Sequence, residues 1–122
     1  MDARTVPRSA RRCVKILFDI NTPAPLAWYL RGHTVSLALD LGWERLKNGK
    51  LLDACERDGY DCLVTCDQSL QYQQNFAGRK LTVVVLNSNN WPRIRSVAAR
   101  IATRIDFADS GQLLEIDIEA LR

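Results

Sequence analysis

Residues 80–86 read Lys-Leu-Thr-Val-Val-Val-Leu, a nearly continuous apolar run rich in β-branched side chains. A strand with one face in water alternates apolar and polar residues, whereas this run does not alternate, which is typical of a strand buried on both faces. Such strands lie inside parallel sheets that helices cover on both sides. The run therefore predicts an α/β domain with this segment at or near the centre of its sheet.

Shorter strand and helix signals alternate on both sides of this run. Thr22-Pro23 and Trp91-Pro92 are helix start signals, and we expect the Thr22 hydroxyl to cap the first of these helices. Gly32 and Gly59 each follow a predicted helix. The alternation predicts right-handed crossovers and a mostly parallel five-stranded sheet with helices on both faces, for which we expect strand order 3-2-1-4-5. The other predicted strands are residues 13–18, 33–37, 61–65 and, at an edge, 112–118; the helices are 22–31, 48–58, 67–75 and 91–104.

The length of 122 residues suits one domain. We assign residues 13–122 to it and treat residues 1–12 as a basic arm that need not be ordered. The composition, 47% hydrophobic and 25% charged, is ordinary for a globular protein, and no apolar run approaches the roughly 20 residues that span a bilayer. Because no secretory signal is visible either, we expect a cytoplasmic protein without membrane contact.

Four cysteines, at positions 13, 55, 62 and 66, raise the question of metal or disulfide chemistry. No pair has the CxxC spacing that zinc sites favour. Cys62 and Cys66 flank a predicted strand, so their Cα atoms would lie beyond bridging distance. We therefore expect four free thiols, as is usual in the cytosol.

Two aspartates follow predicted strands directly or closely. Asp19 comes after the first strand and Asp67 comes two residues after the third. In open α/β sheets, ligands bind outside the carboxyl ends of the strands, so these carboxylates can share one crevice. Paired carboxylates suit Mg²⁺ or Mn²⁺, which can activate a water against a phosphodiester. The alternative for Asp67 is a purely structural role, as the cap of the helix that follows it.

Polar neighbours could complete such a site. Asn21, Asn48 and Gln68 could ligate through their carbonyl oxygens or orient waters, and Lys47, with Lys50, could hold a phosphate. In the alternative, the two asparagines make turns and caps and the lysines are simply solvated.

The ordered segments of the chain resemble a bacterial PIN-like family of largely uncharacterised proteins. The resemblance covers about residues 14–118. Three segments carry it: KILFDINTPAPL, GHTVSLALDLGWERLKNGKLLDACERDGYDCLVTCDQSLQYQQNFAGRKLTVVVL and NWPRIR. It implies the PIN-like three-layer fold, because the family belongs with the PIN-domain nucleases, metal-dependent ribonucleases that include VapC-type toxins.

The same resemblance assigns residues. Asp19 matches the acidic residue after the first strand, and Asp67 matches the acidic residue of the VT-x-D-Q segment. This sequence departs from its relatives at other positions that are often acidic or polar, because it carries Ile20, Lys50, Asn87 and Asn89 there. The implied metal site thus has two carboxylates where a full PIN site has three or four.

Other features have alternative interpretations. Residues 68–75 mix glutamines with Tyr72 and could face the bases of single-stranded RNA, or could form a plain exposed helix. His33 has no acid nearby in sequence and is expected to be structural. Arginines spread around the last helix favour a solvated face, and the exposed setting of Trp43 suggests an interface. The arginines are Arg93, Arg95, Arg100 and Arg104.

Two functional hypotheses follow. The first is a metal-dependent ribonuclease, the toxin-like component of a toxin-antitoxin pair, with Asp19 and Asp67 holding Mg²⁺ or Mn²⁺. Its implied partners are RNA and a small helix-turn-helix antitoxin-like protein, with a homodimer as a further expectation. The alternative is a non-catalytic PIN-like binding module with a degenerate acidic site, which acts through a protein partner.

Overall fold

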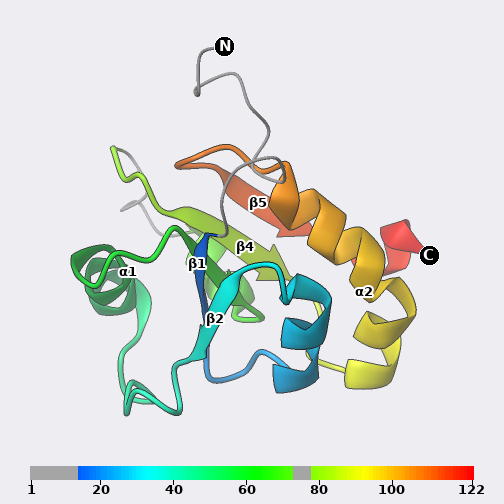
Figure 1. The fold of residues 1–122 in the computed structure, drawn as a ribbon, viewed down its shortest axis with the longest axis horizontal. Helices are drawn as coiled ribbons and strands as arrows, with labels where there is room; N and C mark the ends of the chain where they lie inside the picture. Colours follow the sequence, from blue (N-terminus) through cyan, green and yellow to red (C-terminus); the bar gives the residue numbers. More distant parts are fainter. Residues whose placement is uncertain (1–13, 73–77) are drawn as a thin grey trace.

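The computed structural model describes residues 14–72 and 78–122. The predicted arm at 1–12 lies outside them, as does the end of the helix predicted at 67–75. Five strands form one sheet in which every neighbouring pair is parallel (Figure 1). The strands are β1 (Lys15–Phe18), β2 (Thr34–Leu37), β3 (Cys62–Thr65), β4 (Thr82–Leu86) and β5 (Leu113–Ile116).

The α/β class and the five-stranded sheet are confirmed, but the expected strand order 3-2-1-4-5 is wrong. The observed order is β2-β1-β3-β4-β5, so β1 lies between β2 and β3. The physical reason is burial: all four residues of β3 are buried on both faces, and an edge position would expose them. Strand β4 is likewise buried throughout, as residues 80–86 indicate, and β5 is at an edge as predicted.

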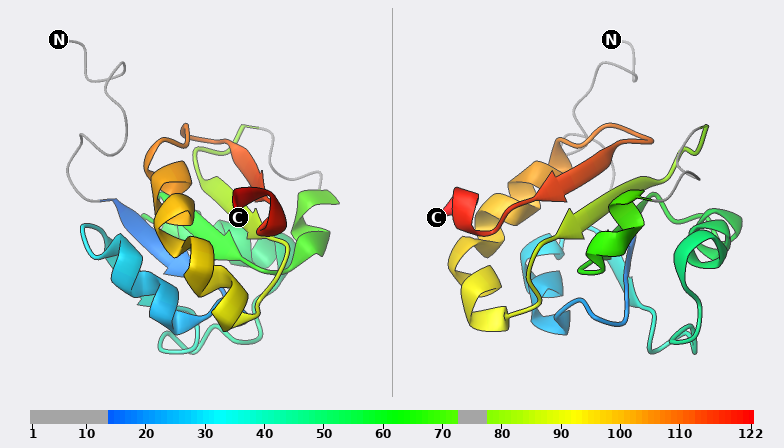
Figure 2. Two further views of the ribbon diagram at one scale, coloured as in Figure 1. Left: turned by 90° about the vertical axis from the view of Figure 1, so that its right-hand side faces the viewer. Right: turned by 180° about the vertical axis from the view of Figure 1, so that it is seen from behind.

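Helical segments cover both faces of the sheet, as predicted (Figure 2). One layer contains α2 and η3, and α1 and η4 pack on the opposite face. The last turn, η6, lies beside α2 near the C-terminus (Figure 1). The helical segments are η3 (Ala24–Leu30), α1 (Asn48–Arg57), η4 (Gln68–Tyr72), α2 (Trp91–Asp106) and η6 (Glu119–Leu121).

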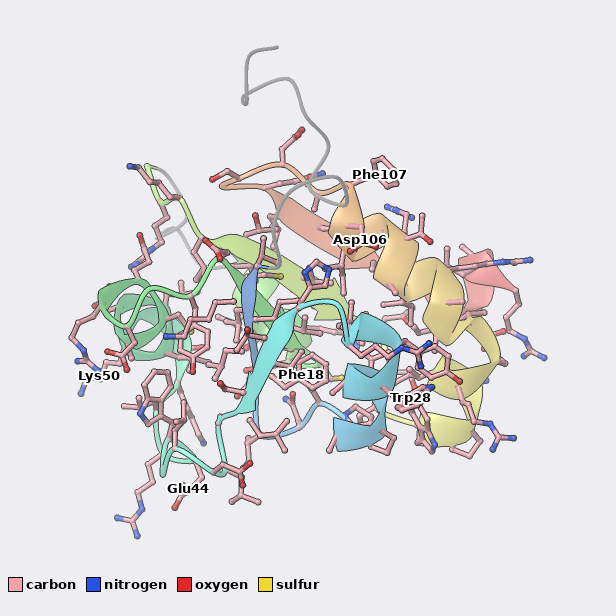
Figure 3. All side chains as sticks on the ribbon, viewed as in Figure 1. Phe18, Trp28, Glu44, Lys50, Asp106 and Phe107 are labelled. Carbon is pink, nitrogen blue, oxygen red and sulfur yellow. The ribbon has the colours of Figure 1, made fainter. Side chains whose placement is uncertain are left out.

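The core is divided by the sheet because successive strand residues point to opposite faces. On the α1 side, Leu17 and Leu63 pack with Leu51. On the α2 side, Phe18 and Val64 pack with apolar residues of η3 and α2 (Figure 3). Both faces of β1 and β3 are thus buried, and the polar side chains of these strands are found only at the strand ends.

The segment after β1 differs from its prediction. Residues 24–30 form a 3₁₀ helix whose N-cap is Pro23, without a side-chain cap. The hydroxyl of Thr22, expected to cap this helix, donates instead to the carbonyl oxygen of Val64 at 2.9 Å. Thr22 therefore ties the loop after β1 to β3, and the prolines at 23 and 25 favour the short helix by fixing φ.

His33 has a structural role at the other edge of the sheet. Its Nδ1 accepts the backbone N–H of Val14 at 3.1 Å, and its Nε2 lies 2.7 Å from Asp106 Oδ1. The ring therefore joins the start of β1 to the end of α2. Sequence reasoning expected a structural histidine but could not find Asp106, which is 73 residues away.

Two of the described cysteines, Cys55 and Cys66, fit the expectation of free thiols. Cys55 and Cys66 form no disulfide, whereas Cys13 lies outside the described residues. Burial, with a contribution from Asp19, raises the pKa of the Cys55 thiol to about 12. Within the described ranges, no helix combines the length and apolar character needed to cross a membrane.

Candidate functional site

The strand order creates a switch point between β1 and β3. From β1 the chain moves outward to β2, and it then returns across β1 to form β3 on the other side. In doubly wound sheets, ligands bind outside the carboxyl ends of the strands at such a point. Asp19 directly follows β1, Thr65 ends β3, and Asp67 lies two residues further on. The predicted acids therefore stand where this topology favours a ligand.

A cavity of about 210 Å³ opens at this position. It is formed by the end of β1, the connection between β2 and α1, the first turns of α1, and the start of η4. Its lining includes most of the predicted site residues, but neither Gln68 nor Lys50 is among them. The lining residues are Asp19, Ile20, Asn21, Glu44, Leu46, Lys47, Asn48, Leu51, Asp67 and Leu70.

One buried hydroxyl connects the two aspartates. Thr65 Oγ1 donates to Asp19 Oδ2 at 2.7 Å and accepts the backbone N–H of Asp67 at 3.0 Å. Thr65 is fully buried, so its hydroxyl depends on these partners and on Asn21 Oδ1, which lies 3.5 Å away. Sequence reasoning did not select Thr65, although a polar residue at the end of an otherwise apolar strand was a usable signal.

Asp19 is a buried carboxyl group that lines the cavity. It is 9% exposed; Oδ1 accepts the N–H of Ile20 at 2.8 Å and Oδ2 accepts the Thr65 hydroxyl. Among residues 14–72 and 78–122, no lysine, arginine or histidine forms an ion pair with it. A buried carboxylate without a counter-charge opposes folding, and the two hydrogen bonds to Asp19 offset part of that cost.

Asp67 has the capping role that was its structural alternative. Its Oδ1 accepts the backbone N–H of Ser69 at 3.0 Å and the Ser69 hydroxyl at 2.6 Å. In the described part of the chain no hydrogen bond to its second carboxylate oxygen is found. Capping therefore occupies one oxygen of Asp67, while the carboxylate still lines the cavity.

Asn21 supports the loop geometry. Its Oδ1 accepts the backbone N–H of Cys66 at 3.0 Å, so this oxygen is directed at the backbone beyond β3. The Cys66 thiol donates to the carbonyl oxygen of Ser88 at 3.3 Å. Burial raises the pKa of Cys66 to about 11, against a lowering by the Thr22 hydrogen bond and with a further increase from Asp19. The thiol is therefore protonated at neutral pH and is a poor nucleophile.

The basic side of the cavity comes from the start of α1. Lys47 is the N-cap residue of α1, but no side chain caps this helix and its first turn contains no acid. Asn48 has φ of 53°, in the left-handed region that asparagine tolerates better than most residues. The first N–H groups of α1 are thus uncapped by side chains, which favours an anion beside Lys47.

Glu44 adds a third carboxylate to the cavity that sequence reasoning missed. It lies in the connection between β2 and α1, and its side chain is exposed (Figure 3). No strand end or motif marks this position, so only the folded connection shows that it reaches the cavity. Even so, the described residues contain no group of three histidine, cysteine or acidic side chains arranged to hold a metal ion.

Gln68 lies at a neighbouring cavity of about 270 Å³, which is bounded by the ends of β4 and β5. Its Nε2 donates to the carbonyl oxygen of Asn87 at 3.4 Å. The side chain of Asn87 in turn binds Asp117 Oδ1 and the N–H of Ile118, at 3.0 and 2.9 Å. Asn87 therefore joins the ends of β4 and β5 in this chain.

Comparison with known proteins adds no assignment. No family model matches the chain, and no curated protein or solved structure matches it. The resemblance to the PIN-like family therefore stays a prediction, while the α/β fold and the cavity are properties of the structure itself.

Proposed function

We propose that this protein is a metal-dependent ribonuclease that hydrolyses RNA phosphodiesters at the cavity between β1 and β3. One observation carries the proposal: the buried Asp19 lines the cavity together with Asp67 and has no cationic partner in the described part of the chain. A carboxylate in this position is costly unless it meets a positive charge. The proposed positive charge is a divalent cation.

The chemistry of the donors fits Mg²⁺ or Mn²⁺. Both ions prefer oxygen ligands, and Mg²⁺ is usually bound by one or two carboxylates together with substrate phosphates and waters. Asp19 and Asp67 would hold the ion, with Glu44 close enough to the cavity to contribute charge. When bound, such an ion supplies positive charge to the phosphodiester and a water that ionises more readily.

The remaining residues suit a phosphate substrate. Lys47 and the uncapped first turn of α1 bring positive charge to the cavity. Asn48 lines the same surface and offers an amide for hydrogen bonding. These groups would hold a phosphate, while Thr65 fixes the carboxylate of Asp19.

The biological setting rests on the resemblance to PIN-like proteins. It supports RNA as the substrate, a toxin-like role beside a small helix-turn-helix antitoxin-like protein, and a cytoplasmic location. A homodimer belongs to the same group of proposals.

A specific observation favours the alternative of a non-catalytic binding module. The described residues form no three-ligand metal cluster, and one oxygen of Asp67 is engaged as a helix cap. Under this alternative the acidic site is degenerate and the protein acts by binding a partner. The two hypotheses differ in whether the carboxylates are needed for turnover.

The test is cleavage of labelled single-stranded RNA in the presence of Mn²⁺, with wild type, Asp19→Asn and Asp67→Asn. Asparagine caps helices as well as aspartate does, so Asp67→Asn removes charge and keeps the cap. We expect wild type to cut and both variants to lose nearly all activity while keeping their thermal midpoints.

Asp109→Asn is the matched control, because Asp109 is exposed and lies before β5, outside the cavity lining. It should cut as wild type does. A wild-type protein that leaves RNA intact at millimolar Mn²⁺ would reject the nuclease and favour the binding module.

A further inference from the structure

A second hollow surface lies on the opposite layer of the molecule from α1. It is a groove of about 300 Å³ where the outer face of α2 meets η3 and the C-terminal residue. Figures 1 and 2 show η3 beside the first half of α2 and η6 beside the same helix. We call it the arginine groove; its lining includes Tyr29, Arg95, Ser96, Ala99, Arg100 and Arg122.

The groove continues along α2. An adjoining hollow of about 330 Å³ shares Ala99 and Arg100 with it and extends to Thr103 and Arg104. Helical residues rise about 1.5 Å each, so Arg95, Arg100 and Arg104 are spaced by roughly 6–8 Å along the axis. Arg95 and Arg100 line the arginine groove, and Arg100 and Arg104 line the adjoining hollow, so arginines that spread around α2 border two neighbouring depressions.

The charge of this surface is positive. In the described part of the chain, Arg95 and Arg104 form no ion pair, and Arg100 donates to the carbonyl oxygen of Leu121. Glu119 is the acid at this end, where it pairs with Arg93 at 3.2 Å and with Arg122 at 3.3 Å. One carboxylate therefore faces several guanidinium groups, and the surplus favours a polyanion.

Two exposed aromatic rings belong to η3, which contacts α2 beside this groove. Trp28 is 65% exposed and Tyr29 is 38% exposed, and Tyr29 lines the groove itself. The guanidinium carbon of Arg31 lies 4.4 Å from the centre of the Trp28 ring, and the ring centre of Tyr29 lies 6.5 Å from that of Trp91. Large exposed rings with an adjacent arginine are suited to stacking with flat bases.

From these features we infer that the arginine groove binds single-stranded RNA outside the acidic cavity. The proposal rests on the proposed function for the choice of RNA. Arginines account for the phosphates and the η3 aromatics account for the bases, a combination that single-strand binding surfaces use. An acidic peptide would match the arginines alone and leave the exposed rings without a role.

The two surfaces are distinct in composition. The groove takes its residues from η3, α2 and the C-terminus, whereas the acidic cavity takes its residues from the loop after β1, the connection after β2, α1, and Asp67 with η4. No residue lines both. The arginine groove would hold the RNA, and hydrolysis of one phosphodiester would take place in the acidic cavity.

The test is fluorescence anisotropy of a labelled single-stranded RNA with the full chain in EDTA, over a series of salt concentrations. The variants are Arg95→Gln with Arg104→Gln, and separately Trp28→Ala. For the double variant we expect a loss of affinity of about tenfold or more and a salt slope smaller by about 1.4, since each lost phosphate contact on a single strand contributes about 0.7. Trp28→Ala should weaken binding by about fivefold or more and leave the slope unchanged.

One control variant separates this proposal from the nuclease. Arg57→Gln, on exposed Arg57 of α1, should bind RNA as wild type does and should cut RNA in Mn²⁺ as wild type does. If the groove variants weaken RNA binding as predicted but wild type does not cut RNA in Mn²⁺, the RNA-binding groove would be upheld and the nuclease proposal rejected. Cleavage with unchanged RNA binding in all groove variants would reject the groove and uphold the nuclease. An acidic peptide that competes fully, with Trp28→Ala without effect on RNA binding, would overturn RNA as the occupant.

Discussion

At the scale of single residues, the site depends on Thr65 as much as on the two aspartates. Its hydroxyl orients the Asp19 carboxyl group and holds the backbone N–H of Asp67, in a fully buried position. A residue that binds two functional groups through one hydroxyl is a positioning residue, because it contacts no substrate itself. Its loss should affect both stability and metal binding.

Thr65→Val removes this hydroxyl while retaining a side chain of the same shape. We expect the free energy of unfolding to fall by about 1–3 kcal/mol, since a buried carboxyl oxygen and a buried N–H lose their partner. Mn²⁺ affinity should fall with it, and Thr65→Ser should restore both. Urea unfolding and calorimetric Mn²⁺ titration are the measurements.

Thr82→Val is the matched control for that experiment. Thr82 is equally buried, in the neighbouring strand β4, and its hydroxyl donates to the carbonyl oxygen of Asp109 at 2.7 Å. It should lose stability and keep Mn²⁺ affinity. If Thr65→Val behaved in the same way, Thr65 would have a structural role only.

The sequence could indicate Asp19 and Asp67 because each stands beside a recognisable strand. It could not indicate Glu44, whose place at the cavity depends on how the connection after β2 folds. It also could not decide between the two interpretations of Asp67. The structure shows that capping and cavity lining coexist, because they use different parts of one carboxylate.

At the scale of elements, turns with left-handed glycines set where strands and helices begin. Gly59 follows α1 with φ of 79°, and Gly111 precedes β5 with φ of 78°. A Cβ at Gly111 would lie 2.7 Å from the carbonyl oxygen of Arg79, whereas a Cβ at Gly59 would meet nothing within 4 Å. The turn before β5 is thus packed closely against the segment that leads into β4.

Alanine at these two glycines separates backbone conformation from crowding. Gly59→Ala should cost about 1–2 kcal/mol, the penalty for a left-handed residue with a Cβ. Gly111→Ala should cost clearly more, because backbone must also move. Urea unfolding of both variants is the measurement, and equal losses would contradict the close packing of this turn.

Element identity was largely predictable from the sequence, because apolar runs and Pro or Gly signals are local. The strand order was not, since it depends on which side of β1 the chain returns to after α1. Residues 62–65 nevertheless contained a signal that was not used: a run as apolar as Cys62-Leu-Val-Thr65 is unsuited to a sheet edge. The 3₁₀ form of η3 was unpredictable for a different reason. The Thr22 hydroxyl does not cap this helix, because it donates a hydrogen bond to the carbonyl oxygen of Val64 in β3.

At the scale of the whole molecule, the formal net charge is only +3, but acidic and basic side chains lie on separate surfaces. Carboxylates of Asp19, Glu44 and Asp67 gather at the cavity, while arginines gather on the outer face of α2. Separate acidic and basic surfaces on one small domain suit a polyanionic strand that is held by one surface and acted on at the other. The central claim is that the acidic surface binds a divalent cation.

The most direct test of that claim is calorimetric titration of Mn²⁺ into wild type and Asp19→Asn, with thermal midpoints of both proteins. We predict that wild type binds Mn²⁺ and that Asp19→Asn loses affinity by about tenfold or more, which corresponds to about 1.4 kcal/mol or more. The midpoint should change little, because the removal of a buried charge without a counter-charge offsets the loss of one acceptor oxygen. Wild type that gives no binding heat at millimolar Mn²⁺, or Asp19→Asn that binds equally tightly, would contradict the claim.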